Sequence, residues 1–444
     1  MTEKGYGMGV LRKLPLAAGA TTLALLASVG SAFADEAPKI DSGSTAWMLT
    51  SSALVLMMTI PGLALFYGGM VRKKNVVAIT AQNFAITALV TVLWTIIGYS
   101  LAFRDGGALQ AYIGGFDRLF LKGMGVNEIS GVIPESVFMV FQMTFAIITP
   151  ALITGAFADR MKFSSLLAFM GLWLIFIYAP VAHWVWGGGF LGSAGVLDFA
   201  GGTVVHINAG IAGLVTCLVL GPRKGYGTEN MAPHNVVLTM IGASLLWVGW
   251  FGFNAGSELA ADGRAGFAFV VTQVATGMAA LAWLFAEWLV HKKPTLLGMC
   301  SGAVAGLVAI TPASGFVDPV GALWIGLAAG VICFIASTSV KRAIGYDDAL
   351  DVFGVHCIGG IVGALLTGVF ATMAVTGATD PVGGIDGNWG QVIVQIKGIL
   401  TTLVWSGVGT FVLLMIVKIF FGLRVSPQEE VEGLDINLHG ETVQ

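Results

Sequence analysis

The segment DFAGGTVVHINAGIAG, Asp198 to Gly213, places a single histidine inside an apolar, glycine-rich stretch. Its core returns about 150 residues later, where Val205, His206, Gly210, Ile211 and Gly213 are matched by Val355, His356, Gly360, Ile361 and Gly363. An ionisable group inside a membrane segment is costly and is therefore a functional candidate. Many transporters are built from duplicated halves whose polar groups meet near the middle of the bilayer. The repeat predicts a path lined by two histidines.

The composition indicates a chain that faces lipid. Hydrophobic residues make up 56% of it and charged residues 11%, whereas soluble domains carry about 25% charge. The net charge of −3 and the absence of a basic cluster argue against a nucleic-acid partner. The four cysteines lie in apolar segments without a CxxC spacing, so we interpret them as packing residues and expect neither a metal site nor a cofactor.

Three parts follow from hydropathy. Residues 1–34 resemble a signal peptide, because a basic start and the apolar run Leu16–Val29 precede Ala32-Phe33-Ala34. An uncleaved extra helix is the alternative. Residues 35–420 form the transmembrane domain, and residues 421–444 form a polar, acidic cytoplasmic tail that is either regulatory or only solvated.

The transmembrane domain is predicted to be an all-α bundle of eleven helices. Apolar runs of this length suit spanning helices rather than barrel strands. The runs are 45–70, 76–101, 136–157, 165–183, 201–220, 236–256, 266–290, 297–312, 320–340, 351–374 and 393–420. Because each histidine motif ends a set of five, the second set enters the membrane with the opposite polarity. The pattern is a 5+5 inverted repeat plus a final helix.

Basic residues favour one side of the membrane, which the positive-inside rule assigns to the cytoplasm. They lie in the first, third, fifth, seventh and ninth connections: Arg72, Lys73, Lys74, Arg160, Lys162, Arg223, Lys224, Lys292, Lys293, Lys341 and Arg342. We therefore expect a multi-pass protein of the cytoplasmic (inner) membrane. Its N-terminus would lie outside after signal cleavage and its C-terminus in the cytoplasm.

Two aromatic clusters, at 182–189 and 249–257, belong to the predicted outer half of the bundle. Aromatic residues at a membrane interface are often only anchors. They are also suited to a cation site, because a desolvated aromatic face attracts a small cation by about 2 kcal/mol. The hydroxyl of Ser257 could accept a hydrogen bond from the same cation.

These motifs resemble the bacterial ammonium transporters of the Amt/Mep/Rh family from about residue 45 to 442. The matching blocks are PGLALFYGG (61–69), FADRMKFS (157–164), AHWVWGGG (182–189), LDFAGGTVVHINA (197–209), GWFGFNAGS (249–257), CSGAVAGLV (300–308), DVFGVH (351–356) and EGLDINLHGE (432–441). The resemblance implies uptake of ammonium by a homotrimer in which each protomer has its own pore. It also implies a PII signalling protein that docks at the cytoplasmic face.

The resemblance also assigns roles to particular residues. The external recruitment site would consist of Trp186, Phe145 and Ser257. The gate would be Phe145 stacked over Phe253. The twin pore histidines would be His206 and His356, and the acidic residue of the family matches Asp198. A metalloenzyme with a metal between the histidines and an ammonium sensor with little transport are the alternatives.

Local sequence gives Asp198 a second role. It stands just before Ala200, Gly201 and Gly202, which open the fifth helix, so it is suited to cap that helix. Backbone N–H groups and the helix dipole would favour its ionised form and should lower its pKa. We expect Asp198 to shape the outer entrance and to supply a fixed negative charge, rather than to act as the base that removes the ammonium proton.

Overall fold

The structure is a computed structural model that describes residues 39–443, so the predicted signal at 1–34 lies outside the described residues. The α-helices are α2 (Ser42–Met57), α3 (Ala64–Met70), α4 (Val76–Leu93), α5 (Tyr99–Phe103), α6 (Glu135–Ile153), α7 (Phe163–Trp173), α8 (Ala179–Trp186), α9 (Phe190–Ser193), α10 (Asn208–Leu220), α11 (Val236–Gly256), α12 (Gly263–His291), α13 (Leu296–Ile310), α14 (Pro319–Ile335), α15 (Lys341–Ile344), α16 (Ile358–Phe370), α17 (Met373–Thr376), α18 (Gly390–Phe421) and α19 (Pro427–Glu432).

Shorter elements link these helices. The π-helical turns are η2 (Met58–Leu63), η4 (Trp94–Gly98), η8 (Leu174–Tyr178), η9 (Gly202–Ile207), η10 (Ala336–Val340), η11 (Phe353–Cys357) and η13 (Asp435–His439). The 3₁₀ turns are η3 (Lys73–Asn75), η5 (Gly107–Leu109), η6 (Leu119–Leu121), η7 (Thr154–Phe157) and η12 (Gly384–Asp386). One antiparallel hairpin pairs β1 (Ile129–Ser130) with β2 (Ile133–Pro134).

The predicted all-α membrane fold is confirmed, although the count differs by one. Within residues 39–443, ten helical segments are long and apolar enough to cross a membrane. The run predicted at 297–312 forms α13, which has only 15 residues. At 1.5 Å per residue it spans about 23 Å, less than the roughly 30 Å of a bilayer core. Eleven helices result only when α13 is counted.

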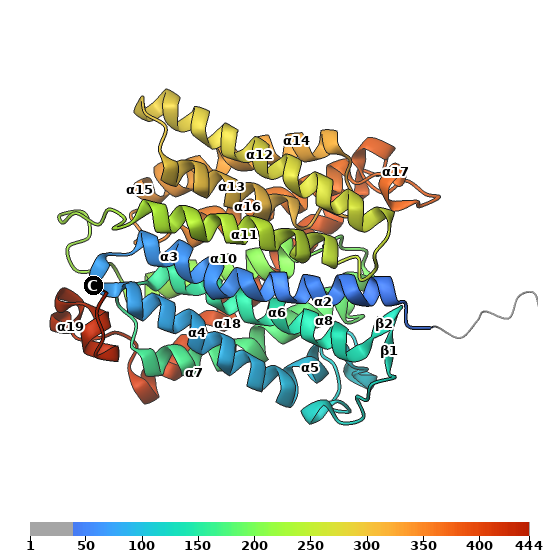
Figure 1. The fold of residues 1–444 in the computed structure, drawn as a ribbon, viewed down its shortest axis with the longest axis horizontal. Coiled ribbons are helices and arrows are strands. Elements are labelled where there is room, and N and C mark those ends of the chain that lie inside the picture. Colours follow the sequence, from blue (N-terminus) through green and yellow to red (C-terminus); the bar gives the residue numbers. More distant parts are fainter. Residues whose placement is uncertain (1–38, 444) are drawn as a thin grey trace, which may run out of the picture. The chain divides into compact units, whose positions relative to one another are not determined.

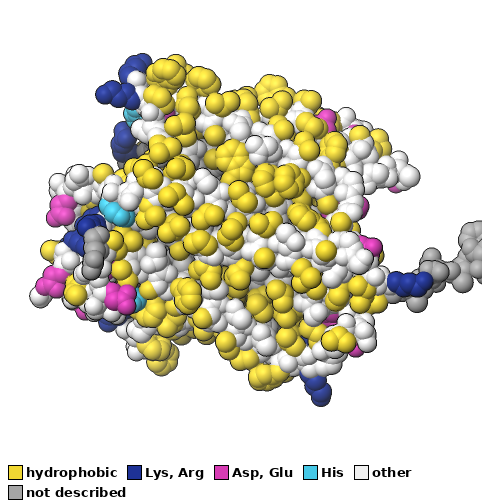
Figure 2. Space-filling model, in the orientation of Figure 1, with side chains coloured by type: hydrophobic (Ala, Val, Ile, Leu, Met, Phe, Trp, Pro, Cys, Tyr) yellow, Lys and Arg dark blue, Asp and Glu magenta, His cyan; other side chains and the backbone are white. Residues whose placement is uncertain are grey.

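The two ends of the bundle differ. Figure 1 shows α15 and α19 at one end, here called the tail side, and the β1–β2 hairpin with α17 at the other, the hairpin side. Hydrophobic side chains cover the middle of the face in Figure 2, and charged ones gather toward the ends. Such an apolar band is what lipid would surround.

The tail segment, residues 422–443, contacts three of the basic connections that were predicted to share its side. The Lys74 ammonium donates to the Val431 carbonyl, and the Val425 N–H donates to the Arg160 carbonyl at 3.1 Å. The Lys224 N–H donates to the Glu430 carboxylate at 2.7 Å. These contacts place the three connections and the C-terminal segment on one side of the bundle, as the charge pattern indicates.

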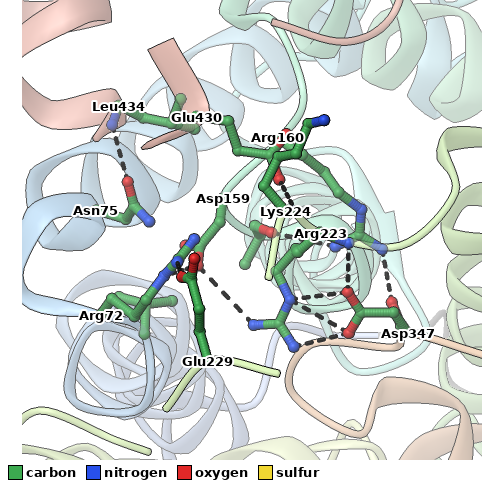
Figure 3. Close-up of polar contacts among 12 residues, drawn as sticks. Arg72, Asn75, Asp159, Arg160, Arg223, Lys224, Glu229, Asp347, Glu430 and Leu434 are labelled. Atoms are coloured by element: carbon green, nitrogen blue, oxygen red, sulfur yellow. Dashed lines mark hydrogen bonds and ion pairs between the residues drawn. The ribbon is translucent and has the colours of Figure 1, made fainter. Parts of the chain in front are cut away.

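Buried ion pairs hold the tail-side connections together (Figure 3). The Arg223 guanidinium binds Asp347 with an Nη2–Oδ1 distance of 2.7 Å, and Arg160 donates to the Asp347 carbonyl at 2.6 Å. Arg72 pairs with Asp159 at 3.1 Å. Burial alone would raise the pKa of Asp347, but the hydrogen bonds and charge of Arg223 outweigh it and lower the pKa. Arg160, one of the basic residues of the third connection, is fully buried.

The two histidine motifs cross at their glycines. A Cβ atom on Gly210 would lie 2.3 Å from the Cys357 nitrogen, and one on Gly360 would lie 3.2 Å from the Ile207 nitrogen. Gly360 lies one repeat offset of 150 residues after Gly210, and Cys357 lies the same offset after Ile207. The repeat therefore converts one contact pair into the other with the partners exchanged. Reciprocal contacts of this kind are those that a two-fold relation produces. They agree with the predicted inverted repeat.

We expect Gly210→Ala to destabilise the bundle, because the new Cβ would overlap backbone that cannot rotate away. Overpacking of a dense core costs about 1–3 kcal/mol, so the unfolding temperature in detergent should fall measurably. Gly277→Ala on α12 is the matched control, because no atom lies within 4 Å of its added Cβ. Equal unfolding temperatures for the two variants would contradict the close crossing.

Candidate functional site

A cavity of about 460 Å³, here called the vestibule, brings together three predicted residues, Phe145, Trp186 and Ser257. The Trp186 ring is perpendicular to the Phe145 ring, with the ring centres 5.9 Å apart. The Ser257 hydroxyl donates to the Phe253 carbonyl at 2.8 Å. Its oxygen lone pairs are therefore available to accept a further hydrogen bond. Aromatic faces and a free acceptor are groups that suit a small cation with N–H donors.

Two stacked phenyl rings lie between the vestibule, which Phe145 lines, and a second cavity, which Phe253 lines. Phe145 and Phe253 have ring centres 4.1 Å apart and an interplanar angle of 25°, and both side chains are buried. This second, enclosed cavity lies against Phe253 and leaves about 10 Å³ for the centre of a water-sized molecule, roughly room for one. Its lining is Met58, Leu63, Phe66, Ile148, Leu152, His206, Leu246, Trp250, Phe253, Val304 and His356. Anything that moves between these two cavities by way of the phenyl pair has to displace its rings.

The predicted histidine pair lines this small cavity. The His206 and His356 Nδ1 atoms are 3.3 Å apart, and the rings are nearly parallel at 16°. When both rings are neutral, one Nδ1 donates the shared hydrogen and the other accepts it, so the two rings are opposite tautomers. The two Nε2 atoms are then one donor and one acceptor. Among the described residues, His206 Nε2 has no hydrogen-bond partner.

Asp198 caps the helix that carries His206, as its position in the sequence predicted. One carboxylate oxygen accepts from the Gly201 and Gly202 N–H groups at 2.9 and 2.6 Å. The other accepts from Thr203 and Val204 at 2.8 and 3.0 Å. Its carbonyl accepts the Trp186 indole N–H at 2.8 Å. Asp198 thus fixes both the start of η9 and the position of a vestibule ring.

The expected direction of the Asp198 pKa shift was wrong. Burial raises its pKa above the ordinary value, and the four backbone N–H donors only partly offset this. The sequence indicated the donors but not the burial, which leaves the side chain only 5% exposed. The four donors still fit the carboxylate form, because both of its oxygens can only accept.

Trp250 is part of the site, and sequence reasoning gave it no separate role. Its ring stacks on His206 at 5.4 Å and 17°, and its indole N–H donates to the Thr311 hydroxyl at 2.8 Å. It therefore packs against the ring of one histidine of the pair. The sequence could have indicated that Trp250 belongs to the site, because residues three apart on a helix, such as Trp250 and the gate residue Phe253, share one face.

Comparison with known proteins decides the family. A family model described as "Ammonium Transporter Family" matches residues 46–444. The chain belongs to the ammonium transporter family. An ammonium transporter of Aquifex aeolicus is 53% identical over 412 residues, which cover 92% of this chain and 95% of the relative.

Solved structures agree with this family. The crystal structure of Saccharomyces cerevisiae Mep2 has a TM-score of 0.81 and 34% identity, covering 87% of this chain and 88% of that one. A structure named "Sensor Amt Protein" has a TM-score of 0.83 and 28% identity, covering 89% and 98%. The resemblance stated from the sequence motifs is confirmed. As a member of this family the chain is a multi-pass membrane transporter and not an enzyme.

Proposed function

We propose that the protein carries ammonium across the cytoplasmic membrane by taking up the ion in the vestibule and passing neutral ammonia beyond it. One observation carries the proposal: a stacked phenyl pair separates an aromatic, hydroxyl-lined cavity from a small apolar cavity that contains two histidines. The first cavity suits the charged form of the substrate, and the second suits the neutral form.

Recruitment would depend on Trp186, Phe145 and Ser257. Two aromatic faces stabilise a desolvated cation by about 2 kcal/mol, and the Ser257 oxygen accepts one of its N–H groups. The Asp198 charge adds a field that favours cations. Because the Asp198 oxygens are occupied by four N–H donors, we assign it this field and not the removal of the proton.

Selectivity would follow from deprotonation near the gate. An ion that enters the apolar cavity loses its hydration and finds no groups there to replace it, so its entry costs much free energy. Neutral ammonia loses far less. Phe145 and Phe253 would move aside, and the Nε2 atoms of the histidines would offer one donor and one acceptor to ammonia. Potassium has no proton to release, so it cannot use this route.

The test is a simultaneous measurement of current and ammonium flux in proteoliposomes that contain the full-length protein. An ammonium gradient should drive flux, and an equal potassium gradient should drive none. Comparable potassium flux, or no ammonium flux, would overturn the proposal. The ratio of charge to ammonium moved determines whether the separated proton also crosses.

Two other functions predict different results. A sensor would bind ammonium and transport little; the structural neighbour named "Sensor Amt Protein" makes this a specific candidate. A metalloenzyme would need at least three ligands, and within residues 39–443 no group of three or more His, Cys, Asp or Glu is placed to hold a metal. Stoichiometric zinc or iron in the purified protein would favour the enzyme.

The assembly and its regulation are part of the proposal. We propose a homotrimer with one pore in each protomer, a cytoplasmic tail side, and a PII signalling protein that docks there. The basic connections and the bound tail segment supply a charged, polar surface for such a partner. Crosslinking and native mass would test the trimer, and pull-down with purified PII would test the partner.

Glu430 is expected to hold the tail segment in place. Its carboxylate is 1% exposed, pairs with Arg424 at 2.8 Å and accepts the Lys224 N–H. Losing hydrogen bonds to a charged group costs about 1.5–3 kcal/mol, so Glu430→Ala should release the segment and accelerate its proteolysis at least about tenfold. Glu432→Ala, at an exposed position, is the control. If both variants are cleaved at the wild-type rate, Glu430 does not hold the tail.

A further inference from the structure

The tail side holds a buried carboxylate that has no role in the proposed function. Asp348 lies eight residues before His356, as Asp198 lies eight residues before His206. Both acids cap the turn that carries their histidine: the Phe353 N–H, at the start of η11, donates to Asp348 Oδ2 at 2.7 Å. The repeat therefore provides one acidic cap toward each end of the pore. Extending the sequence repeat upstream would have identified this second acid.

The two caps differ in how their oxygens are occupied. Each Asp198 oxygen accepts two N–H groups. Asp348 is 0% exposed, and its Oδ1 has no hydrogen-bond partner among residues 39–443. A buried acceptor without a partner costs free energy of about 1–3 kcal/mol, more for a charged group. Oδ1 can therefore still accept a hydrogen bond.

The surrounding charges do not neutralise Asp348. The carboxylate of the adjacent Asp347 is paired with Arg223, and Arg160 donates to the Asp347 backbone carbonyl (Figure 3). Lys341, the cation that most influences Asp348, has its Nζ 2.7 Å from Asp351. Within the described chain, no Lys or Arg nitrogen pairs with Asp348 at 4.0 Å or less. With all three groups ionised, Asp348, Asp351 and Lys341 carry one net negative charge. Burial and the Asp351 charge raise the pKa of Asp348, and Lys341 with the neighbouring backbone N–H groups only partly offsets this.

The position of Asp348 connects the small cavity with the tail side. Tyr67 follows Phe66 and donates to the Leu152 carbonyl, and both Phe66 and Leu152 line that cavity. A Cβ atom on Gly155 would lie 2.9 Å from the Tyr67 hydroxyl and 2.8 Å from the side chain of Val352, which directly precedes the Phe353 N–H that Asp348 accepts. On the other side, the Asp351 side chain is 39% exposed. Asp348 therefore lies between a residue next to the pore and a carboxylate that reaches solvent.

We infer that Asp348 Oδ1 is the main ligand of an inner cation site, which binds ammonium at the tail side of the pore. The inference rests on the proposed transport function and extends it to the exit. Ammonia that passes the histidines would regain a proton there, and an N–H of the resulting ion would fill the open position on Oδ1. The same site would receive ammonium in the reverse direction, as the vestibule does on the hairpin side.

The first test is binding, with thallous ion as a probe of ammonium-like charge. Crystals of the full-length protein soaked in a thallous salt should give an anomalous peak beside Asp348 Oδ1. Asp348→Asn should lose that peak, because it removes the charge while the amide oxygen still accepts the Phe353 N–H. Glu432→Gln, which removes an exposed tail-side charge, should retain it. Absence of the peak in the wild-type protein overturns the inference whether or not the variants fold.

The second test is the sidedness of transport in proteoliposomes of one orientation. In Asp348→Asn, the ammonium concentration for half-maximal flux from the tail side should rise at least fivefold. The value from the hairpin side should stay within twofold of the wild-type value. Equal changes from both sides, or no change, contradict an inner site. Failure of the proposed transport function would instead appear as a lack of ammonium flux in the wild-type protein. The thallium experiment measures binding alone, so its result does not depend on transport.

Discussion

Replacing His356 by alanine is expected to reduce ammonium flux about 10- to 100-fold while the protein still folds. The small cavity is apolar except for the two imidazoles, so ammonia that enters it has no other side chain there with which to exchange hydrogen bonds. Leaving a buried hydrogen-bonding group without its partner costs about 1–3 kcal/mol, which is consistent with a loss of flux of that size. The flux of labelled ammonium or methylammonium into proteoliposomes measures the effect.

His206→Ala should have an effect of similar size, because the two rings determine each other's tautomer through the Nδ1–Nδ1 contact of 3.3 Å. Removing either ring leaves the other Nδ1 without its partner. The double variant should therefore lose little more flux than either single variant, since effects within one network are not additive. Independent losses that multiply in the double variant would contradict a shared hydrogen. Unchanged flux in both single variants would remove the histidine conduit altogether.

Packing alone predicts a different pattern. If the histidines only fill space, His206→Ala would lower the unfolding temperature, since Trp250 would lose the ring stacked on it at 5.4 Å. His206→Gln is the matched variant, because it fills part of the volume and keeps a donor and an acceptor. Partial flux in His206→Gln, with an unfolding temperature similar to that of His206→Ala, would assign the loss to hydrogen bonding.

Hydropathy predicted the helices well because membrane spans are long and continuous. The run predicted at 236–256 coincides with α11, and the run at 201–220 begins one residue before η9. The histidine repeat indicated the centre of the site for the same reason: a polar residue is conspicuous in an apolar segment. The shortness of α13 was already visible, because the run 297–312 is the shortest of the eleven and Thr311 and Pro312 follow Ile310, where the helix ends.

The burial of particular charged residues could not be predicted from the sequence, because it depends on contacts between segments that lie far apart in the chain. Arg160 and Asp347 meet across 187 positions, so their burial follows from the fold and not from neighbouring residues. The same holds for Asp198, whose burial reversed the expected pKa shift. Asp348 was overlooked for a simpler reason. The shared histidine motif begins at Val205 and Val355, and the matching acids lie seven residues upstream of these valines.

Asp198→Asn is expected to reduce ammonium flux at least about 100-fold, because it combines two losses. Both oxygens of the carboxylate accept two N–H groups each, so the amide nitrogen of Asn would face two donors. That conflict costs about 1–3 kcal/mol and should lower the unfolding temperature, although Asn is otherwise a good cap. The second loss is the negative charge beside Trp186, which weakens the attraction for a cation in the vestibule.

Asp198→Glu separates these two losses, since it keeps the charge but cannot place a longer side chain on the same four donors. If the charge attracts ammonium, the Glu variant should retain measurable flux when the Asn variant shows almost none. If only the cap matters, both variants should lose flux in proportion to their loss of stability. Asp318→Asn is the control, because Asp318 caps α14 through a single N–H at 2.7 Å and lies outside the vestibule lining. An Asp198→Asn protein that folds and transports at the wild-type rate would show that the charge has no part in transport, and Asp198 would then be a helix cap alone.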